Sequence, residues 1–177
     1  SLNLEDTPAL VSLCGNIHLT FEPGEDGIEA SLDGRRLGDS LRAEAVGLAS
    51  SRVAAVPEVR TALLALQRRY RRLPGLVADG RDMGTVVFPE ANVKIFLDAS
   101  VEERARRRFR QLRAAGKSVT LDRLMSDLDA RDRRDRERAV SPTIPAADAI
   151  VVDSTNMDLD QVVDHVLGIV RQTLTEG

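Results

Sequence analysis

One stretch constrains the fold of this chain more than any other: residues 76–89, which read LVADGRDMGTVVFP. A short apolar run, Leu76 to Ala78, ends at an acid, Asp79, and Gly80 follows at once. Such a run predicts a buried strand that stops at the carboxyl edge of a parallel sheet. Because ligands of open α/β sheets bind at that edge, the stretch predicts both a fold class and the place of a site.

Three charged side chains of this stretch are candidate binding residues. Arg81 can clamp a phosphate through two parallel hydrogen bonds. Asp82 can accept hydrogen bonds from an amino group, and Asp79 can hold the water shell of a metal ion without ligating the ion directly. The alternative is a solvated turn with an incidental ion pair, and the stretch by itself does not separate the two interpretations.

Strand-like and helix-like patterns alternate along the rest of the chain. Two further apolar runs, Val93–Leu97 and Ala149–Val152, also end next to acids and predict two more buried strands. Alternation of this kind predicts a parallel sheet with covering helices. Three strands are few for such a sheet, so we expect further strands upstream. The helices are expected to begin near Thr7, Ser40, Pro57, Val101, Thr120 and Leu159.

A different pattern occupies residues 16–37, where apolar and polar residues alternate. Pro23-Gly24 supplies one turn, and Asp33-Gly34 is a strong hairpin signal. The pattern predicts a small antiparallel sheet that is too small to stand alone. We therefore expect an insertion packed on the main body.

The helix that begins near Thr120 changes character along one face. Leu124 and Leu128 belong to an apolar stripe, and steps of three and four residues lead from them to Arg131, Asp135 and Arg138. Isolated buried charges are costly, so these side chains must pair with one another or face a ligand. Both a self-paired ladder and a face for an anionic, hydroxyl-bearing ligand fit the pattern.

Composition excludes several classes of protein. The 177 residues carry a net charge of −3, with 3% aromatic residues and no Trp, which does not favour nucleic-acid binding. The one cysteine excludes an internal disulfide, and no apolar run reaches the length of a membrane span. The chain is predicted to be a cytoplasmic domain that does not bind membranes.

A phosphate-binding loop of the P-loop type needs a glycine, four residues and then Gly-Lys-Ser or Gly-Lys-Thr, between a strand and a helix. Gly116-Lys117-Ser118 supplies only the second half of the P-loop pattern, because position 111 is Gln, and it follows a helix rather than a strand. We therefore expect no P-loop here and no catalytic role for Lys117.

Four segments together closely resemble bacterial cytidylate kinases, which are P-loop nucleoside monophosphate kinases: DGRDMGTVVFP, VKIFLDAS with the arginine-rich helix after it, RDRRDRERAVSP and PAADAIVVDST. The resemblance spans essentially the whole chain. It implies a core domain of residues 1–15 and 38–177 with a P-loop kinase-type parallel sheet, a lid at about 104–120, and a small β insertion at 16–37 beside the CMP site. Members begin with a strand and a glycine-rich P-loop that this sequence lacks. Residues 1–177 alone are therefore expected to be inactive.

The resemblance implies transfer of the γ-phosphoryl group of ATP, with Mg²⁺, to CMP or dCMP by a monomer. The alternatives are a kinase for UMP or AMP, or a non-catalytic nucleotide-binding module. Four residues are the expected catalytic group: Arg81, Arg131, Arg107 and Asp79. The implied substrate-binding residues are Ser51, Arg60 and Asp82 for cytosine, Arg81 for the monophosphate, and Arg131, Asp135 and Arg138 for the ribose and phosphate. The implied lid arginines are Arg104, Arg107 and Arg108.

Overall fold

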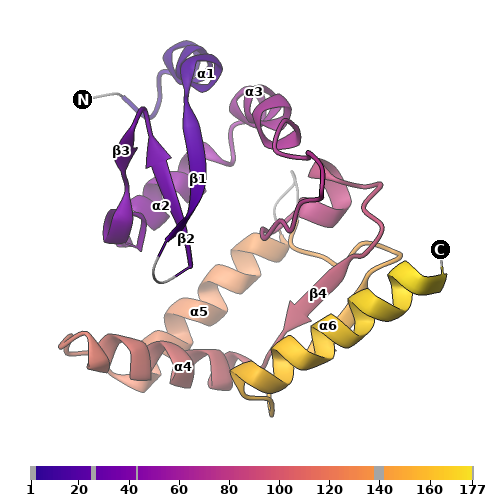
Figure 1. The fold of residues 1–177 in the computed structure, drawn as a ribbon. Helices are drawn as coiled ribbons and strands as arrows, with labels where there is room; N and C mark the ends of the chain where they lie inside the picture. The colour runs from indigo at the N-terminus through magenta and orange to yellow at the C-terminus, as the bar shows by residue number, and fades with distance from the viewer. Residues whose placement is uncertain (1–2, 25–26, 43, 138–141, 177) are drawn as a thin grey trace. The chain divides into compact units, whose positions relative to one another are not determined.

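The computed structural model describes residues 3–24, 27–42, 44–137 and 142–176. The chain forms two compact units, Ser1–Leu76 and Val77–Gly177, each with its own packing (Figure 1). Among the described residues, no helix combines the length and the hydropathy that crossing a membrane requires.

The first unit contains an antiparallel sheet with strand order β1-β2-β3 (Figure 1). Its strands are β1 Leu19–Gly24, β2 Gly27–Leu32 and β3 Arg35–Arg36. Between β2 and β3, Asp33 and Gly34 both have positive φ angles, 49° and 76°, as a two-residue type I′ turn requires. The small antiparallel sheet predicted from the sequence is confirmed.

Two helices of the first unit begin where the sequence predicts them, at Thr7 and Pro57, whereas the α-helix expected from Ser40 begins at Glu44, after a 3₁₀ turn. The helical elements of this unit are α1 Thr7–Asn16, a 3₁₀ turn η1 Gly38–Arg42, α2 Glu44–Val53 and α3 Pro57–Arg68. The Asp6 carboxylate caps α1 by accepting a hydrogen bond from the Ala9 amide at 3.0 Å. Leu10 and Cys14 of α1 pack with Val59 of α3, and these three buried side chains form the core of the unit.

The antiparallel sheet is tied to the segment after α3 by an aromatic pair. The Tyr70 hydroxyl donates to the Leu19 carbonyl at 2.6 Å. The rings of Phe21 and Tyr70 meet edge to face, with centroids 5.2 Å apart. This contact gives the small sheet the support that a hairpin needs to be stable.

The second unit contains a parallel pair of strands. Its elements are a π turn η2 Met83–Val87, strands β4 Ile95–Asp98 and β5 Ile150–Asp153, and helices α4 Val101–Ala114, α5 Leu121–Arg136 and α6 Leu159–Glu176. In the β4–β5 ladder Ile95 lies opposite Ile150, and Asp98 lies opposite Asp153. The two later strands of the prediction are thus confirmed with bounds shifted by one or two residues.

The predicted strand at residues 76–78 is wrong. This segment has no strand conformation, and Val77 is fully exposed. Within the described ranges β4 and β5 pair only with each other, so the segment has no ladder partner for its backbone hydrogen bonds. The expected burial of the other two strands is also wrong in part, since Leu97 is 55% exposed and Val151 is 58% exposed. The fold is mixed α/β, with a two-stranded parallel sheet and a three-stranded antiparallel sheet.

The α1–α3 contact should dominate the stability of the first unit. Val59→Ala should lower the free energy of unfolding by about 2 kcal/mol, because it removes two methyl groups from a fully buried site. Urea denaturation followed by circular dichroism measures the change. The control Val46→Ala, at an exposed position of α2, should change it by less than about 0.5 kcal/mol. Equal losses in the two variants would contradict this account of the core.

Candidate functional site

The carboxyl ends of β4 and β5 lie side by side and are held together by Ser154. The Ser154 amide donates to the Asp98 carbonyl at 2.8 Å, and its buried hydroxyl donates to the same oxygen at 3.0 Å. Asp153 accepts hydrogen bonds from the hydroxyl and the amide of Thr155, which lower the pKa of its carboxyl group. The edge where parallel sheets bind ligands is therefore well ordered here.

The central stretch forms a single π turn instead of a strand. The Val87 amide donates to the Asp82 carbonyl at 3.2 Å, and the Phe88 amide donates to the Met83 carbonyl at 2.7 Å. Asp82 is only 8% exposed, and Val87 and Phe88, at the end of the turn, are also buried. Single π turns are often found at functional sites, where they fix a side chain that a regular helix would turn away. The turn fixes Asp82 in a buried position.

Lys94, at the start of β4, holds the far end of the same stretch. Its ammonium group donates to the Pro89 carbonyl at 2.5 Å and to both carboxylate oxygens of Asp148, at 2.7 and 2.9 Å. The bond from Lys94 lowers the pKa of Asp148. The stem of Lys94 also packs against Gly84, where an added Cβ would lie 3.4 Å from its Cδ. Lys94 thus braces the segment that carries Arg81 and Asp82.

An ion pair joins this segment to α5. A guanidinium nitrogen of Arg81, Nη1, lies 2.5 Å from Oδ2 of Asp135. Nε of Arg131 lies 3.8 Å from the same oxygen. The Asp135 side chain is only 5% exposed, whereas the Arg81 side chain is 43% exposed. A buried carboxylate therefore orients an arginine that still reaches solvent and can bind an anion.

A second ion pair joins α4 to α5. Two guanidinium nitrogens of Arg104 bond the two carboxylate oxygens of Asp132, at 3.0 and 2.5 Å, and its Nε donates to the Ala99 carbonyl at 2.9 Å. The hydrogen bond lowers the pKa of Asp132 and raises the pKa of Arg104. Sequence reasoning missed Asp132, because no local pattern links two residues on different helices.

The other two arginines predicted for the lid have different partners. Arg107 donates to the Ser154 carbonyl at 2.6 Å and to the Met157 carbonyl at 3.2 Å, so it bonds the turn after β5. Arg108 donates to the side chain of Gln111, one turn further along α4, at 2.7 Å. The sequence spacing predicts that these three arginines share one face of the helix. In the structure each has different partners: Asp132 for Arg104, the turn after β5 for Arg107 and Gln111 for Arg108.

The remaining predicted residues are placed as follows. In the first unit, Arg60 of α3 donates to the Ala54 carbonyl at 3.3 Å. Ser51 lies in α2 of the same unit, and its side chain lies outside the described part of the structure. Arg138 also lies outside the described residues. Asp79 is exposed just before the π turn.

The stretch Gly116-Lys117-Ser118 lies in the connection between α4 and α5. Gly116 has a φ of 73°, and the Lys117 amide donates to the Leu112 carbonyl at 2.9 Å, which is the geometry of a helix C-terminus. The prediction that this stretch is no P-loop is confirmed. Across residues 3–24, 27–42, 44–137 and 142–176, no cluster of three or more His, Cys, Asp or Glu is suited to hold a metal ion.

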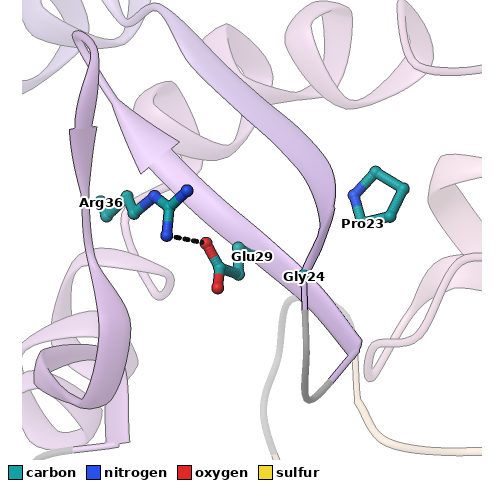
Figure 2. A pocket seen from close by; sticks show the side chains of 4 residues that line it. All are labelled: Pro23, Gly24, Glu29 and Arg36. Atoms are coloured by element: carbon teal, nitrogen blue, oxygen red, sulfur yellow. Dashed lines mark ion pairs between the residues drawn. The ribbon is translucent and has the colours of Figure 1, made fainter.

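A shallow depression lies on the antiparallel sheet, at one end of the β1–β2 hairpin. It is lined by Pro23, Gly24, Glu29 and Arg36, and Arg36 pairs with Glu29 at 2.9 Å (Figure 2). None of the predicted site residues lines it. The arginine–carboxylate cluster of the second unit is therefore the better candidate site.

Buried carboxylates that orient arginines are suited to bind a phosphate group. The family model described as cytidylate kinase matches residues 1–172. The cytidylate kinase of Klebsiella pneumoniae is 50% identical over 173 residues, covering 98% of this chain and 76% of that protein. That of Aeromonas hydrophila is 51% identical, covering 98% and 75%, and that of Escherichia coli O1:K1 is 52% identical, covering 94% and 73%. The chain belongs to the cytidylate kinase family.

The Arg104–Asp132 pair should make stability depend on pH. The lowered pKa of Asp132 means that the pair stabilises the fold above the ordinary value of 3.8 and loses this effect as pH falls through the lowered pKa. Arg104→Gln should reduce the melting temperature by about 3–6 °C at neutral pH, and the difference from the unmodified protein should shrink below pH 3.8. Thermal unfolding across this pH range measures it.

The matched control is Arg106→Gln, which breaks the exposed pair of Arg106 with Glu102 on the same helix. Its melting temperature should change by about 1 °C or less at either pH. A pH-independent loss in Arg104→Gln would contradict the role assigned to Asp132.

Proposed function

We propose that this protein transfers the γ-phosphoryl group of ATP to CMP or dCMP, giving CDP or dCDP. Membership of the cytidylate kinase family supports the reaction. The observation that carries the proposal is the ion pair between buried Asp135 and part-exposed Arg81, directly beside buried Asp82 in the sequence. It supplies a cation for a phosphate and a carboxylate for an amino group within one segment.

The acceptor nucleotide is assigned to the second unit by the chemistry of its side chains. Arg81, oriented by Asp135, binds the monophosphate. Arg131 adds positive charge on the same face, and Asp135 can also accept a hydrogen bond from a ribose hydroxyl. Asp82 accepts from the exocyclic amine of cytosine. For Ser51 and Arg60, which belong to the first unit, a role in holding cytosine rests on the family resemblance alone. For Arg138 the role in binding the ribose and phosphate rests on the family resemblance.

Catalysis in this proposal rests on position and charge. The attacking phosphate oxygen of CMP needs no strong base, because the transition state of phosphoryl transfer is stabilised mainly by cations around the transferred group. Arg81 and Arg131 hold the acceptor in line and neutralise charge on the acceptor side. Residues 104–120 form the proposed lid, whose closure excludes water. Arg108 can move with it, whereas Arg107 is bonded to the turn after β5.

The donor side fits the described residues less well. In the P-loop kinase-type fold proposed here, ATP phosphates are held by backbone N–H groups at the start of a helix together with a lysine. The described residues provide no loop of this kind. Mg²⁺ binds through phosphate oxygens and water, and exposed Asp79 can contact that water shell. No step is therefore assigned to residues of this chain at the donor phosphates.

The proposal predicts how activity divides along the sequence. This chain spans about three quarters of the length of its relatives. Residues 1–177 alone should show no phosphoryl transfer, and the same residues preceded by their encoded upstream sequence should release ADP when CMP is added. A coupled ADP assay with CMP, dCMP, UMP and AMP measures this. Preference for UMP or AMP, or inactivity of the longer chain, would overturn the proposal.

Asp82 should set base selectivity. The carboxylate accepts from the amine of cytosine but faces the carbonyl of uracil with like polarity, and an unpaired buried acceptor costs roughly 1–3 kcal/mol. Asp82→Asn should therefore erode the preference for CMP over UMP by about ten- to a hundredfold in kcat/KM. The control is Asp129→Asn, on the exposed side of α5, which should keep the preference. Unchanged selectivity in Asp82→Asn would refute the assignment.

A further inference from the structure

We infer that Arg104 and Asp132 form a positioning pair for the acceptor site, and that Arg104 acts through α5 rather than through contact with the donor triphosphate. The inference rests on the proposed function, since it names residues that would serve the same reaction. It changes the role that family resemblance gave to Arg104.

All three guanidinium nitrogens of Arg104 donate hydrogen bonds to the protein. Nε donates to the carbonyl of Ala99, one residue beyond β4, and Nη1 and Nη2 donate to Oδ1 and Oδ2 of Asp132. Both side chains are partly buried, at 29% and 16% exposure. Because the fork of an arginine matches a carboxylate only in one plane, the pair fixes α5 in rotation as well as in distance from the end of β4.

Asp132 lies within the charged face of α5. Arg131 precedes it directly, and Asp135 follows it by three residues, which is almost one helical turn. Asp135 in turn holds Arg81 at 2.5 Å. The positive charge of Arg81 is also one of the causes that lower the pKa of Asp132. A rotation of α5 about its axis would therefore move both Arg131 and the carboxylate that orients Arg81.

Turning Arg104 toward the triphosphate would break these bonds. Loss of the bidentate bond would leave the partly buried carboxylate of Asp132 without this partner, and such a loss is costly. Arg106 and Arg110, on the same helix, are exposed and have only one ion pair each with Glu102 or Glu103 among the described contacts. They can turn to an anion at far lower cost.

The test is a double-mutant cycle in the longest encoded form of the protein. Arg104→Lys keeps the charge but loses the fork, and Asp132→Asn keeps the shape but loses the charge. Each single variant should raise KM for CMP by about tenfold, because misplaced Arg81 and Asp135 weaken acceptor binding. The double variant should raise it by the same factor and not by the product, since both changes break one contact. KM for ATP should change less than about twofold in all three.

Control variants break an exposed pair on each helix. They are Arg106→Lys on α4 and Asp129→Asn on α5, whose pairs with Glu102 and Arg133 lie on the surface. Both should leave KM for CMP within about twofold of the unmodified value.

Two kinetic results would overturn the inference. A raised KM for ATP in Arg104→Lys, with normal kinetics in Asp132→Asn, would make Arg104 a ligand of the donor. Lower melting temperatures with unchanged kinetics of the folded protein would make the pair merely structural.

A ligand-free measurement separates this inference from the proposed reaction. The ion pair with Asp135 should slow rotation of the Arg81 guanidinium, which nitrogen-15 NMR detects, with Arg81→Lys to assign the signal. Arg104→Lys should speed that rotation and Arg106→Lys should not. If the unmodified protein released no ADP with CMP, the proposed function would fail. The NMR comparison of Arg104→Lys with Arg106→Lys would still decide the inference. Unchanged Arg81 signals in Arg104→Lys would overturn it.

Discussion

The carboxylate of Asp135 is buried, and a buried negative charge is tolerated only when cations satisfy it. Arg81 meets it from the central stretch and Arg131 meets it from α5 itself. Because Arg81 and Asp135 are 54 residues apart, this pair sets the distance between two segments that no backbone ladder joins. The geometry of the proposed acceptor site depends on it.

The stretch that carries Arg81 is held by its own turn and by its ends. The π turn pairs the amides of residues 86–88 with the carbonyls of residues 82 and 83, and Lys94 bonds the Pro89 carbonyl beyond it. A loop held at both ends loses less conformational entropy when it binds a ligand. The bonds from Arg104 to Ala99 and Asp132 likewise hold α5 against the end of β4. Both segments that carry the proposed site are therefore held by contacts within the protein.

Local patterns predicted much of the fold. The Asp33-Gly34 turn and the amphipathic helices depend on neighbours within a few residues, and both are present. The strand predicted at residues 76–78 failed because a strand depends on a partner elsewhere in the chain. The same apolar residues that would fill a sheet interior are left at the surface without that partner.

Sequence alone determined the family, the residue types of the site and the single face of α5 on which Arg131 and Asp135 lie, because each is written in local spacing or in a specific motif. It also showed correctly that Gly116-Lys117-Ser118 is no phosphate loop. Only the tertiary structure decided that Asp135 holds Arg81, that Asp132 holds Arg104 and that Arg107 bonds the turn after β5. The physical reason is that an arginine in an acid-rich chain has many partners of the right charge, and only the packing of helices and strands brings one of them within bonding distance.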